Sequence, residues 1–244
     1  MIYSAFAKVY DRMMSNIPYV EWTDYLITML ALNNVQPGEK VVELGCGTGT
    51  VTELLTEAGL QMTGVDISGD MLEMARQKNT EAGGIKYLQQ DMRQLKLEEK
   101  ADAAVSICDS MNYLLKKSDM LSALKAVRSN LKEDSVFIFD LKTDRFFRKR
   151  LGDRSFREDM GDFSYIWKNH YFRDKHIHKY GIKIFYKDSG KQPDVEIHYQ
   201  RAYDIEEISG LVLEAGFVDV TFYEAFTYSA PTSRSDRYYI VCHT

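Results

Sequence analysis

The stretch KVVELGCGTG at residues 40–49 is an apolar run that leads into three glycines at alternate positions. The pattern predicts a short buried strand, a tight turn and a helix that begins near Thr50 and stops at Gly59. Glycine lets the backbone turn sharply and approach a ligand closely, while the helix N-terminus faces that ligand. Because such turns also occur purely for packing, the loop alone does not establish a binding site.

Strands and single helices alternate around this loop. Because such units are right-handed βαβ crossovers, we expect an α/β fold with a doubly wound, mostly parallel, seven-stranded sheet. The link between the last two strands is too short for a helix, so the last strand should be antiparallel. Apolar residues at helical spacing also predict one or two helices from Ile2 to Ala31. The predicted strands are 40–44, 61–66, 85–90, 103–108, 136–141, 218–226 and 238–242, and the helices between them are 50–58, 68–79, 119–131 and 205–215.

Residues 145–203 differ in composition from the rest of the chain. They hold 14 Lys and Arg against 8 Asp and Glu, a charge of +6, whereas the remainder holds 17 against 28, a charge of −11. Three runs, near 163–167, 180–186 and 195–203, alternate apolar and polar residues, and residues 188–190 supply a turn. This composition predicts an antiparallel β insertion, or lid for an acceptor, on a core formed by residues 1–144 and 204–244. The polar faces of its strands would hold Lys179, Lys183 and Lys187, and Glu196, His198 and Gln200.

Two acids sharpen the interpretation of the glycine loop. Glu43 is a carboxylate in a strand built to be buried, so it needs a donor from the loop or from a cationic ligand group. Asp66 ends the second strand, where an acid can accept from both hydroxyls of a ribose. The combination indicates a nucleoside-type cofactor and leaves NAD and S-adenosylmethionine as candidates.

At this point the sequence resembles the class I S-adenosylmethionine-dependent methyltransferases. Their first motif, hydrophobic-x-[DE]-x-G-x-G-x-G, is matched by VVELGCGTG at residues 41–49. VDIS at residues 65–68 resembles the end of their ribose-binding strand, and QDM at 90–92 resembles the segment whose acid contacts the adenine. SICDS at 106–110 resembles the segment that flanks the methionine half of the cofactor. NAD is disfavoured because the glycine spacing is GxGxG rather than GxGxxG.

This resemblance implies roles for individual residues. Asp66 would hold the ribose and Asp91 the adenine amine, while Gly45, Cys46 and Gly47 would admit the amino-acid half together with Glu43 and Cys108. Further contacts with the cofactor would come from Ile67, Met71, Met92 and Trp22. The opening FAKVYD at residues 6–11 resembles that of a bacterial group that includes amino-sugar N,N-dimethyltransferases, in which a helix covers the cofactor. That likeness places Tyr10 near both the sulfonium and the acceptor.

An amine acceptor must lose a proton, and Tyr10, Asp109 and Asn112 are the candidate catalytic residues. Tyr113 fits a core position better, and His170, His176, His178 and His198 fit surface or packing positions better than catalysis or metal ligation. The expected acceptor is a small molecule, at nitrogen and possibly phosphate-bearing. Two alternatives stay open: an RNA methyltransferase that uses the basic insertion, and a cofactor-binding scaffold protein without catalysis.

The overall composition supports this picture. The three cysteines are far apart and in no CxxC spacing, which argues against a disulfide scaffold or a zinc ribbon. The first residues carry charges, and no apolar run approaches the roughly 20 residues of a membrane helix. A cytoplasmic enzyme without a metal or membrane partner is therefore expected.

Overall fold

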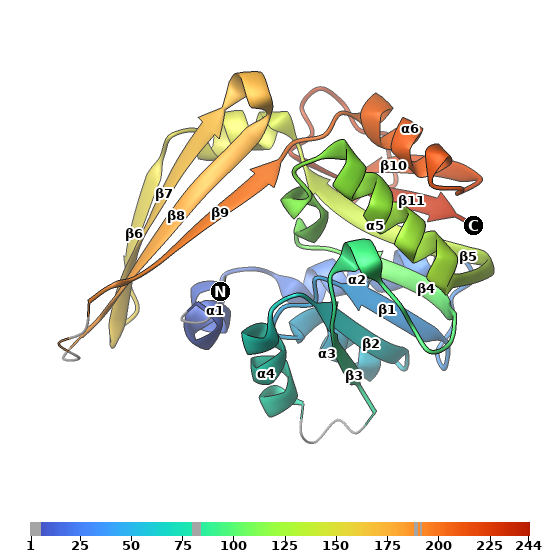
Figure 1. Ribbon diagram of the computed structural model, residues 1–244, viewed down its shortest axis with the longest axis horizontal. Coiled ribbons are helices and arrows are strands. Elements are labelled where there is room, and N and C mark those ends of the chain that lie inside the picture. The colour runs from blue at the N-terminus through green and yellow to red at the C-terminus, as the bar shows by residue number, and fades with distance from the viewer. Residues whose placement is uncertain (1–5, 80–83, 188–189, 191) are drawn as a thin grey trace.

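The computed structural model describes residues 6–79, 84–187, 190 and 192–244 (Figure 1). Its central feature is a seven-stranded sheet in the order β10-β11-β5-β4-β1-β2-β3. Strands β1 to β5 pair in parallel, and β11 is antiparallel to both of its neighbours, as the sequence predicts. The strands are β1 (Lys40–Leu44), β2 (Gln61–Asp66), β3 (Lys86–Gln89), β4 (Ala101–Ser106), β5 (Leu131–Lys142), β10 (Asp219–Glu224) and β11 (Arg237–His243).

Helices cover both faces of this sheet. Alternate residues of β5 explain why: Phe137 and Phe139 join the apolar core under α5 and α6, whereas Val136 and Ile138 join the core under α2 and α3. The chain order reverses between β1 and β4, and at such a switch point a crevice opens at the carboxyl ends of the strands. The helices are α1 (Ala7–Met13), α2 (Tyr19–Leu32), α3 (Thr50–Glu57), α4 (Gly69–Lys78), α5 (Lys117–Asn130) and α6 (Ile205–Glu214).

A second, four-stranded antiparallel sheet follows β5 and stands beside the core (Figure 1). Three of its strands were predicted, but β6 was not, because its five residues are polar or exposed throughout. The predicted turn at residues 188–190 lies mostly outside the described residues. The strands are β6 (Ser155–Asp159), β7 (Phe163–Phe172), β8 (Ile177–Tyr186) and β9 (Asp194–Arg201), and the short helical turns are η1 (Met92–Gln94), η2 (Ser110–Tyr113), η3 (Phe146–Leu151) and η4 (Arg173–Lys175).

The inner face of this second sheet packs on α1. Phe6 and Val9 share an apolar cluster with Phe163, Ile182 and Ile184. The N-terminal helix is therefore held between the second sheet and the core, as Figure 1 shows. The predicted segment before Phe6 lies outside the described residues.

Strand β9 turns its polar side inward. Glu196, His198 and Gln200 are buried, so this polar face is not the one that meets solvent. On the opposite side, Val195 and Ile197 are 59% and 47% exposed. This strand buries polar side chains and exposes apolar ones because its buried side faces a cavity lined by polar groups.

The structure shows where membrane-spanning helices, cysteines and groups of possible metal ligands stand. In the described part of the chain, no helix is long and apolar enough to cross a membrane. Cys46, Cys108 and Cys242 are all free thiols. Among the same residues, no group of three or more His, Cys, Asp or Glu side chains is arranged to hold a metal ion.

Candidate active site

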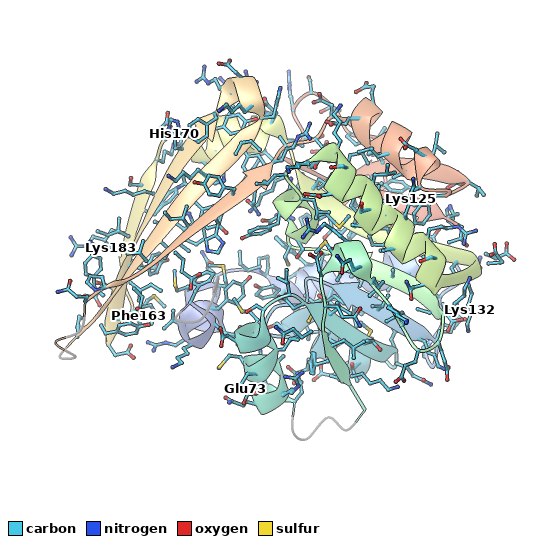
Figure 2. All side chains as sticks on the ribbon, in the orientation of Figure 1. Glu73, Lys125, Lys132, Phe163, His170 and Lys183 are labelled. Carbon is cyan, nitrogen blue, oxygen red and sulfur yellow. The ribbon has the colours of Figure 1, made fainter. Side chains whose placement is uncertain are left out.

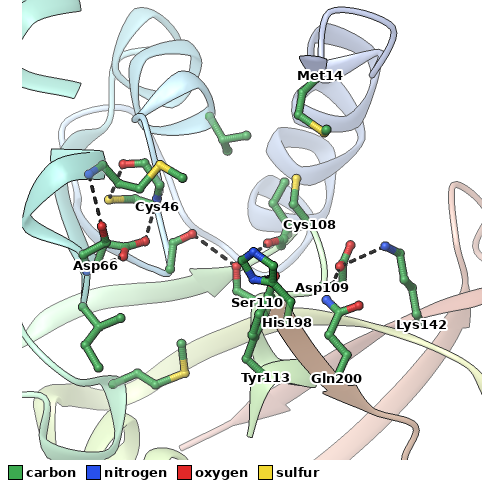
Figure 3. A pocket seen from close by; sticks show the side chains of 18 of the residues that line it. Met14, Cys46, Asp66, Cys108, Asp109, Ser110, Tyr113, Lys142, His198 and Gln200 are labelled. Atoms are coloured by element: carbon green, nitrogen blue, oxygen red, sulfur yellow. Dashed lines mark hydrogen bonds and ion pairs between the residues drawn. The ribbon is translucent and has the colours of Figure 1, made fainter. Parts of the chain in front are cut away.

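A cavity of about 1060 Å³ opens at the carboxyl edge of the parallel strands. The glycine loop, the ends of β2, β3 and β4, helices α1 and α2, and the inner face of the second sheet all contribute to its wall. Figure 3 shows that Cys46 and Asp66 lie on one side of it and that Tyr113, His198 and Gln200 lie on the other. One space therefore joins the predicted cofactor region to the insertion.

The glycine loop has the geometry that its sequence predicts. Gly45, Gly47 and Gly49 have φ values of +69°, +55° and +77°, which residues other than glycine rarely adopt. At Gly45 a Cβ atom would also lie 2.6 Å from the Cβ of Ser110. The loop can therefore bring its backbone to a ligand only while glycine occupies these positions.

Asp66 connects this loop to the second strand. Its two carboxylate oxygens accept hydrogen bonds from the backbone N–H groups of Gly47 and Ser68, both at 2.8 Å. Burial raises the pKa of this carboxyl above its usual value, against the effect of the backbone donors. A carboxylate has about four acceptor positions. The backbone donors therefore leave only part of this acceptor capacity for ligand hydroxyls.

Glu43 has the loop-side donor that its burial demands. The hydroxyl of Thr52, in the first turn of α3, donates to Glu43 Oε2 at 2.5 Å. The carboxyl is 3% exposed, and burial raises its pKa to about 8. Because Glu43 also borders the cavity, a cationic ligand group beside it would return the carboxyl to its charged form.

The third-strand end holds the predicted acid in an ion pair. Arg93 binds both oxygens of Asp91 and, at 3.3 Å, Asp119 on α5. The hydrogen bond from Arg93 lowers the pKa of Asp91. The apolar residues predicted for this region, Ile67, Met71 and Met92, all border the cavity beside it.

The N-terminal helix is fastened to the glycine loop. Asp11 accepts a hydrogen bond of 2.5 Å from the hydroxyl of Thr48 and pairs with Lys78 at 2.8 Å. This contact holds Tyr10 at the cavity wall, where burial raises the pKa of its phenol well above the usual value. Tyr10 is thus a hydrogen-bond donor at neutral pH and a poor proton acceptor.

The end of β4 carries a network of charges. Cys108 and Asp109 have φ values of +60° and +59°, a conformation that is strained outside glycine. Asp109 accepts from Lys142 at 2.9 Å, from Gln200 at 2.6 Å and from Arg237 at 3.0 Å. Burial alone would raise its pKa, but Lys142 and Arg237 outweigh burial and lower it. Asp109 is therefore better suited to positioning its neighbours than to taking a proton.

Asn112 does not reach the cavity. Its amide donates to the backbone oxygens of Lys142 and Arg201 and accepts from the backbone N–H of Lys142. The side chain is fully buried and ties β5 to the end of β9. These contacts give Asn112 a structural position away from the cavity wall, and its predicted catalytic role stays a prediction that Asn112→Ala can test.

Tyr113 and His198 both border the cavity, whereas a core position was expected for Tyr113 and a surface or packing position for His198. The Tyr113 hydroxyl lies 3.3 Å from Nδ1 of His198 and also bonds to the Tyr180 hydroxyl. Nε2 of His198 lies 3.3 Å from Glu196, whose other oxygen accepts from the backbone N–H of Phe6. The His198 ring also stacks on Tyr180 at 4.6 Å.

The three remaining histidines of the insertion lie in two kinds of environment. His170 and His176 are exposed, as expected for surface residues. His178 is buried on the inner face, stacks on Phe147 at 4.9 Å and meets the amide oxygen of Asn169 at 3.0 Å. Burial lowers its pKa to about 4, so His178 is neutral at neutral pH.

Arg237 and Trp22 complete the far wall. The guanidinium of Arg237 lies 4.8 Å from the centre of the Trp22 ring and pairs with both Asp109 and Asp140. Residues from β9 and β11 therefore meet those from β4 at one site. The alternating polar residues of β9 were the sequence signal for its part in the site, but nothing local indicated Arg237.

Residues 41–134 match the family model described as a methyltransferase domain. YqeM of Bacillus subtilis (strain 168), which is named as a methyltransferase, is 33% identical over 240 residues, or 97% of this chain and 95% of that protein. The chain belongs to the methyltransferase family.

Solved structures place this methyltransferase in class I. The crystal structure of an S-adenosylmethionine-dependent methyltransferase from Clostridium acetobutylicum aligns with a TM-score of 0.84 and 27% identity, over 99% of this chain and 98% of that one. The sugar N-methyltransferase KedS8 from Streptoalloteichus shares the fold, with a TM-score of 0.78 and 14% identity over 96% of this chain and 91% of that one. S-adenosylmethionine is the cofactor. Asp66 and Glu43 are carboxyl groups at the cavity wall, of the kind that could accept from ribose hydroxyls and face a cationic group.

Proposed function

We propose that this methyltransferase methylates an amine nitrogen of a small molecule held between the glycine loop and the inner face of the second sheet. The carrying observation is the series of contacts from Glu196 through His198 to Tyr113 at the cavity wall. S-adenosylmethionine supplies an electrophilic methyl group on a sulfonium, with a neutral thioether as leaving group. Asp66, Asp91 and Glu43 would bind the cofactor, and the loop glycines would admit it.

The inner face suits an amine. Trp167 stacks on Tyr180 at 4.8 Å, and Tyr180 stacks on His198, so an aromatic wall faces the cavity. Such walls attract cations, and a protonated amine is one. An amine must lose its proton before its lone pair can attack, and His198 would take that proton through the Tyr113 hydroxyl. Glu196 would stabilise the imidazolium that forms.

The other predicted catalytic residues take different parts. Tyr10 would orient the acceptor by hydrogen bonding, because its phenol stays protonated. Asp109 would hold Lys142, Gln200 and Arg237 in place. KedS8, which shares this fold, is named a sugar N-methyltransferase, and that name is consistent with a nitrogen acceptor for this chain.

A phosphate on the acceptor finds little support. Arg93, Lys142 and Arg237 border the cavity, and each already pairs with a carboxylate. Lys179, Lys183 and Lys187, expected to face the acceptor, do not belong to the described lining. The acceptor that fits best is therefore a small amine without a required phosphate.

The test is transfer of label from methyl-labelled S-adenosylmethionine to a bacterial extract divided into small molecules and RNA. We expect base-stable label in the small-molecule fraction that binds a cation exchanger, since N-methyl amines survive base and methyl esters release methanol. Label in RNA alone, or label lost in base, would contradict the proposal. Cofactor binding without any product would favour the scaffold alternative.

A matched pair of variants tests the proton acceptor. His198→Gln should lower incorporation of label sharply, whereas His178→Gln, at the neighbouring buried histidine, should lower it much less. Raising the pH should partly restore the His198→Gln activity, because the acceptor then loses its proton to water. Equal losses in the two variants, without this pH response, would show that His198 only packs.

A further inference from the structure

The outward side of the second sheet carries positive and apolar groups, most of which lie outside the cavity proposed for methyl transfer. We call it the outer face, formed by Ile166, Lys168, His170, Lys179, Lys183, Val195, Ile197 and Tyr199. Figure 2 shows labelled Lys183 and His170 on this sheet, away from the side that meets the core. None of the outward positions of β7, β8 or β9 is Asp or Glu. The rest of the chain, by contrast, has a net negative charge.

The strand register arranges the outer face in three rows. Ile166, Lys183 and Val195 lie side by side in one row, and Lys168, Gly181 and Ile197 form the next. His170, Lys179 and Tyr199 form the third. Each row therefore has one lysine on the two inner strands and one apolar or aromatic side chain on the edge strand β9.

The spacing of the lysines follows from the same register. Successive rows are two residues apart, which is about 7 Å along a strand. Neighbouring phosphates of an extended single-stranded polynucleotide are separated by a comparable distance. Three ammonium groups at this interval can meet three successive phosphates.

These lysines are available to a ligand. In the described part of the chain, Lys168, Lys179 and Lys183 make no ion pair with a carboxylate. Lys179 lies 5.8 Å from the centre of the Tyr199 ring, and Lys183 lies 5.4 Å from that of Phe185. The ammonium groups thus rest on aromatic rings that a stacking base can share.

The row on β9 supplies the apolar contacts. Val195, Ile197 and Tyr199 are 59%, 47% and 40% exposed, which is unusual for three apolar side chains in succession on one strand face. Aromatic and apolar platforms beside a basic track are how many proteins bind single strands, because every base has a stacking face. Ile197 and Tyr199 also border the cavity, so this surface continues to its mouth.

We propose that the outer face binds a single-stranded polynucleotide, with phosphates on the lysines of β7 and β8 and bases on the β9 row. An anionic membrane fits less well. A membrane-binding surface places apolar groups at its centre and lysines around its margin. Here the lysines occupy the inner strands and the apolar row lies at the edge.

The test is fluorescence anisotropy with fluorescein-labelled 12-mers of oligouridylate and oligothymidylate, which also shows whether RNA or DNA is preferred. Three phosphate contacts predict a slope of log affinity against log salt of about −2, at about −0.7 per contact. Replacing Lys168, Lys179 and Lys183 together by Gln should remove this slope and weaken binding about tenfold or more. Tyr199→Ala should weaken binding roughly 5- to 150-fold by loss of stacking.

A matched control changes the charge equally elsewhere. Lys96, Lys100 and Lys125 are exposed on the core, and their joint replacement by Gln should leave affinity and slope nearly unchanged. Calorimetry with S-adenosylhomocysteine should give wild-type affinity for both triple variants. That measurement separates failure of this proposal from failure of the proposed methyl transfer.

Three results would overturn the proposal. Oligonucleotide binding that the outer-face variants do not change would place the contact elsewhere. Binding to phosphatidylglycerol vesicles, with none to either 12-mer, would make the outer face a membrane surface. The absence of binding to both probes at low salt would leave a solvated sheet face.

Discussion

Binding of the cofactor should release a proton from Glu43. The carboxyl is buried with the Thr52 hydroxyl as its donor, and its pKa of about 8 leaves it about nine-tenths protonated at pH 7. A cationic group of the cofactor beside Glu43 would favour the carboxylate, so the proton has to leave. Binding of S-adenosylhomocysteine at pH 7 should therefore release about 0.9 proton.

The measurement is calorimetry of S-adenosylhomocysteine binding in buffers of contrasting ionisation enthalpy, where the slope of the apparent enthalpy gives the protons released. Glu43→Gln keeps an oxygen for Thr52 but carries no titrating proton, so it should release none. Its affinity should also fall, because the charge opposite the cofactor's ammonium is gone. Equal proton release in the wild type and Glu43→Gln would refute the assignment of Glu43.

The same carboxyl gives the apo protein a pH dependence. Its pKa is about 8 in the folded chain against 4.5 for an unperturbed glutamate, so the folded state holds the extra proton between these values. The free energy of unfolding should consequently fall as pH rises from about 5 to 8. Chemical denaturation of wild type and Glu43→Gln across this range should show a smaller decline in the variant.

Three further substitutions separate binding roles from structural ones. Asp66→Ala should cost about 1.5–3 kcal/mol of cofactor affinity, or roughly 10- to 150-fold in Kd by calorimetry, and an unchanged Kd would remove Asp66 from the site. Asn112→Ala removes hydrogen bonds to three partly buried backbone groups and should cost about 2–4 kcal/mol in denaturant unfolding. A stable but inactive variant would instead favour a catalytic role. Gly45→Ala should weaken S-adenosylhomocysteine binding, because the added Cβ would meet Ser110. Gly38→Ala is the control: its φ is +93°, no atom lies within 4 Å of the added Cβ, and the variant, which has the backbone strain alone, should bind normally.

Much of the parallel sheet could be predicted from the sequence because its signals are local. The loop glycines, the apolar strand runs and the helix stops each act within a few residues. Element boundaries were less accurate: β4 begins at Ala101 rather than Ala103, and β5 begins at Leu131 rather than Val136. Strand β6 has no apolar alternation, since it is an exposed edge that pairs through its backbone.

The residues of the site likewise form two groups: those at the ends of predicted strands, and those that only the tertiary structure brings together. Glu43, Asp66 and Asp91 lie at or beside the ends of predicted parallel strands, and the topology of the sheet brings those ends together. Arg237 and Gln200 come from distant strands and meet Asp109 only through tertiary structure. Asn112 is adjacent in sequence to the cavity residue Tyr113, yet its amide is hydrogen-bonded to the backbone of β5 and β9.

Strand β9 shows why alternation predicts a strand without predicting which side is buried. A period of two fixes two faces, and a polar face is assigned to solvent only if the other side meets an apolar core. The inner side of β9 meets a cavity, where His198 and Gln200 find the partners Tyr113 and Asp109. The hydrophobic side chains are consequently left outside, beside the lysines of β8. Both unusual faces thus follow from one strand: the inner face lines the cavity proposed to hold the acceptor, and the outer face is the surface proposed to bind a polynucleotide.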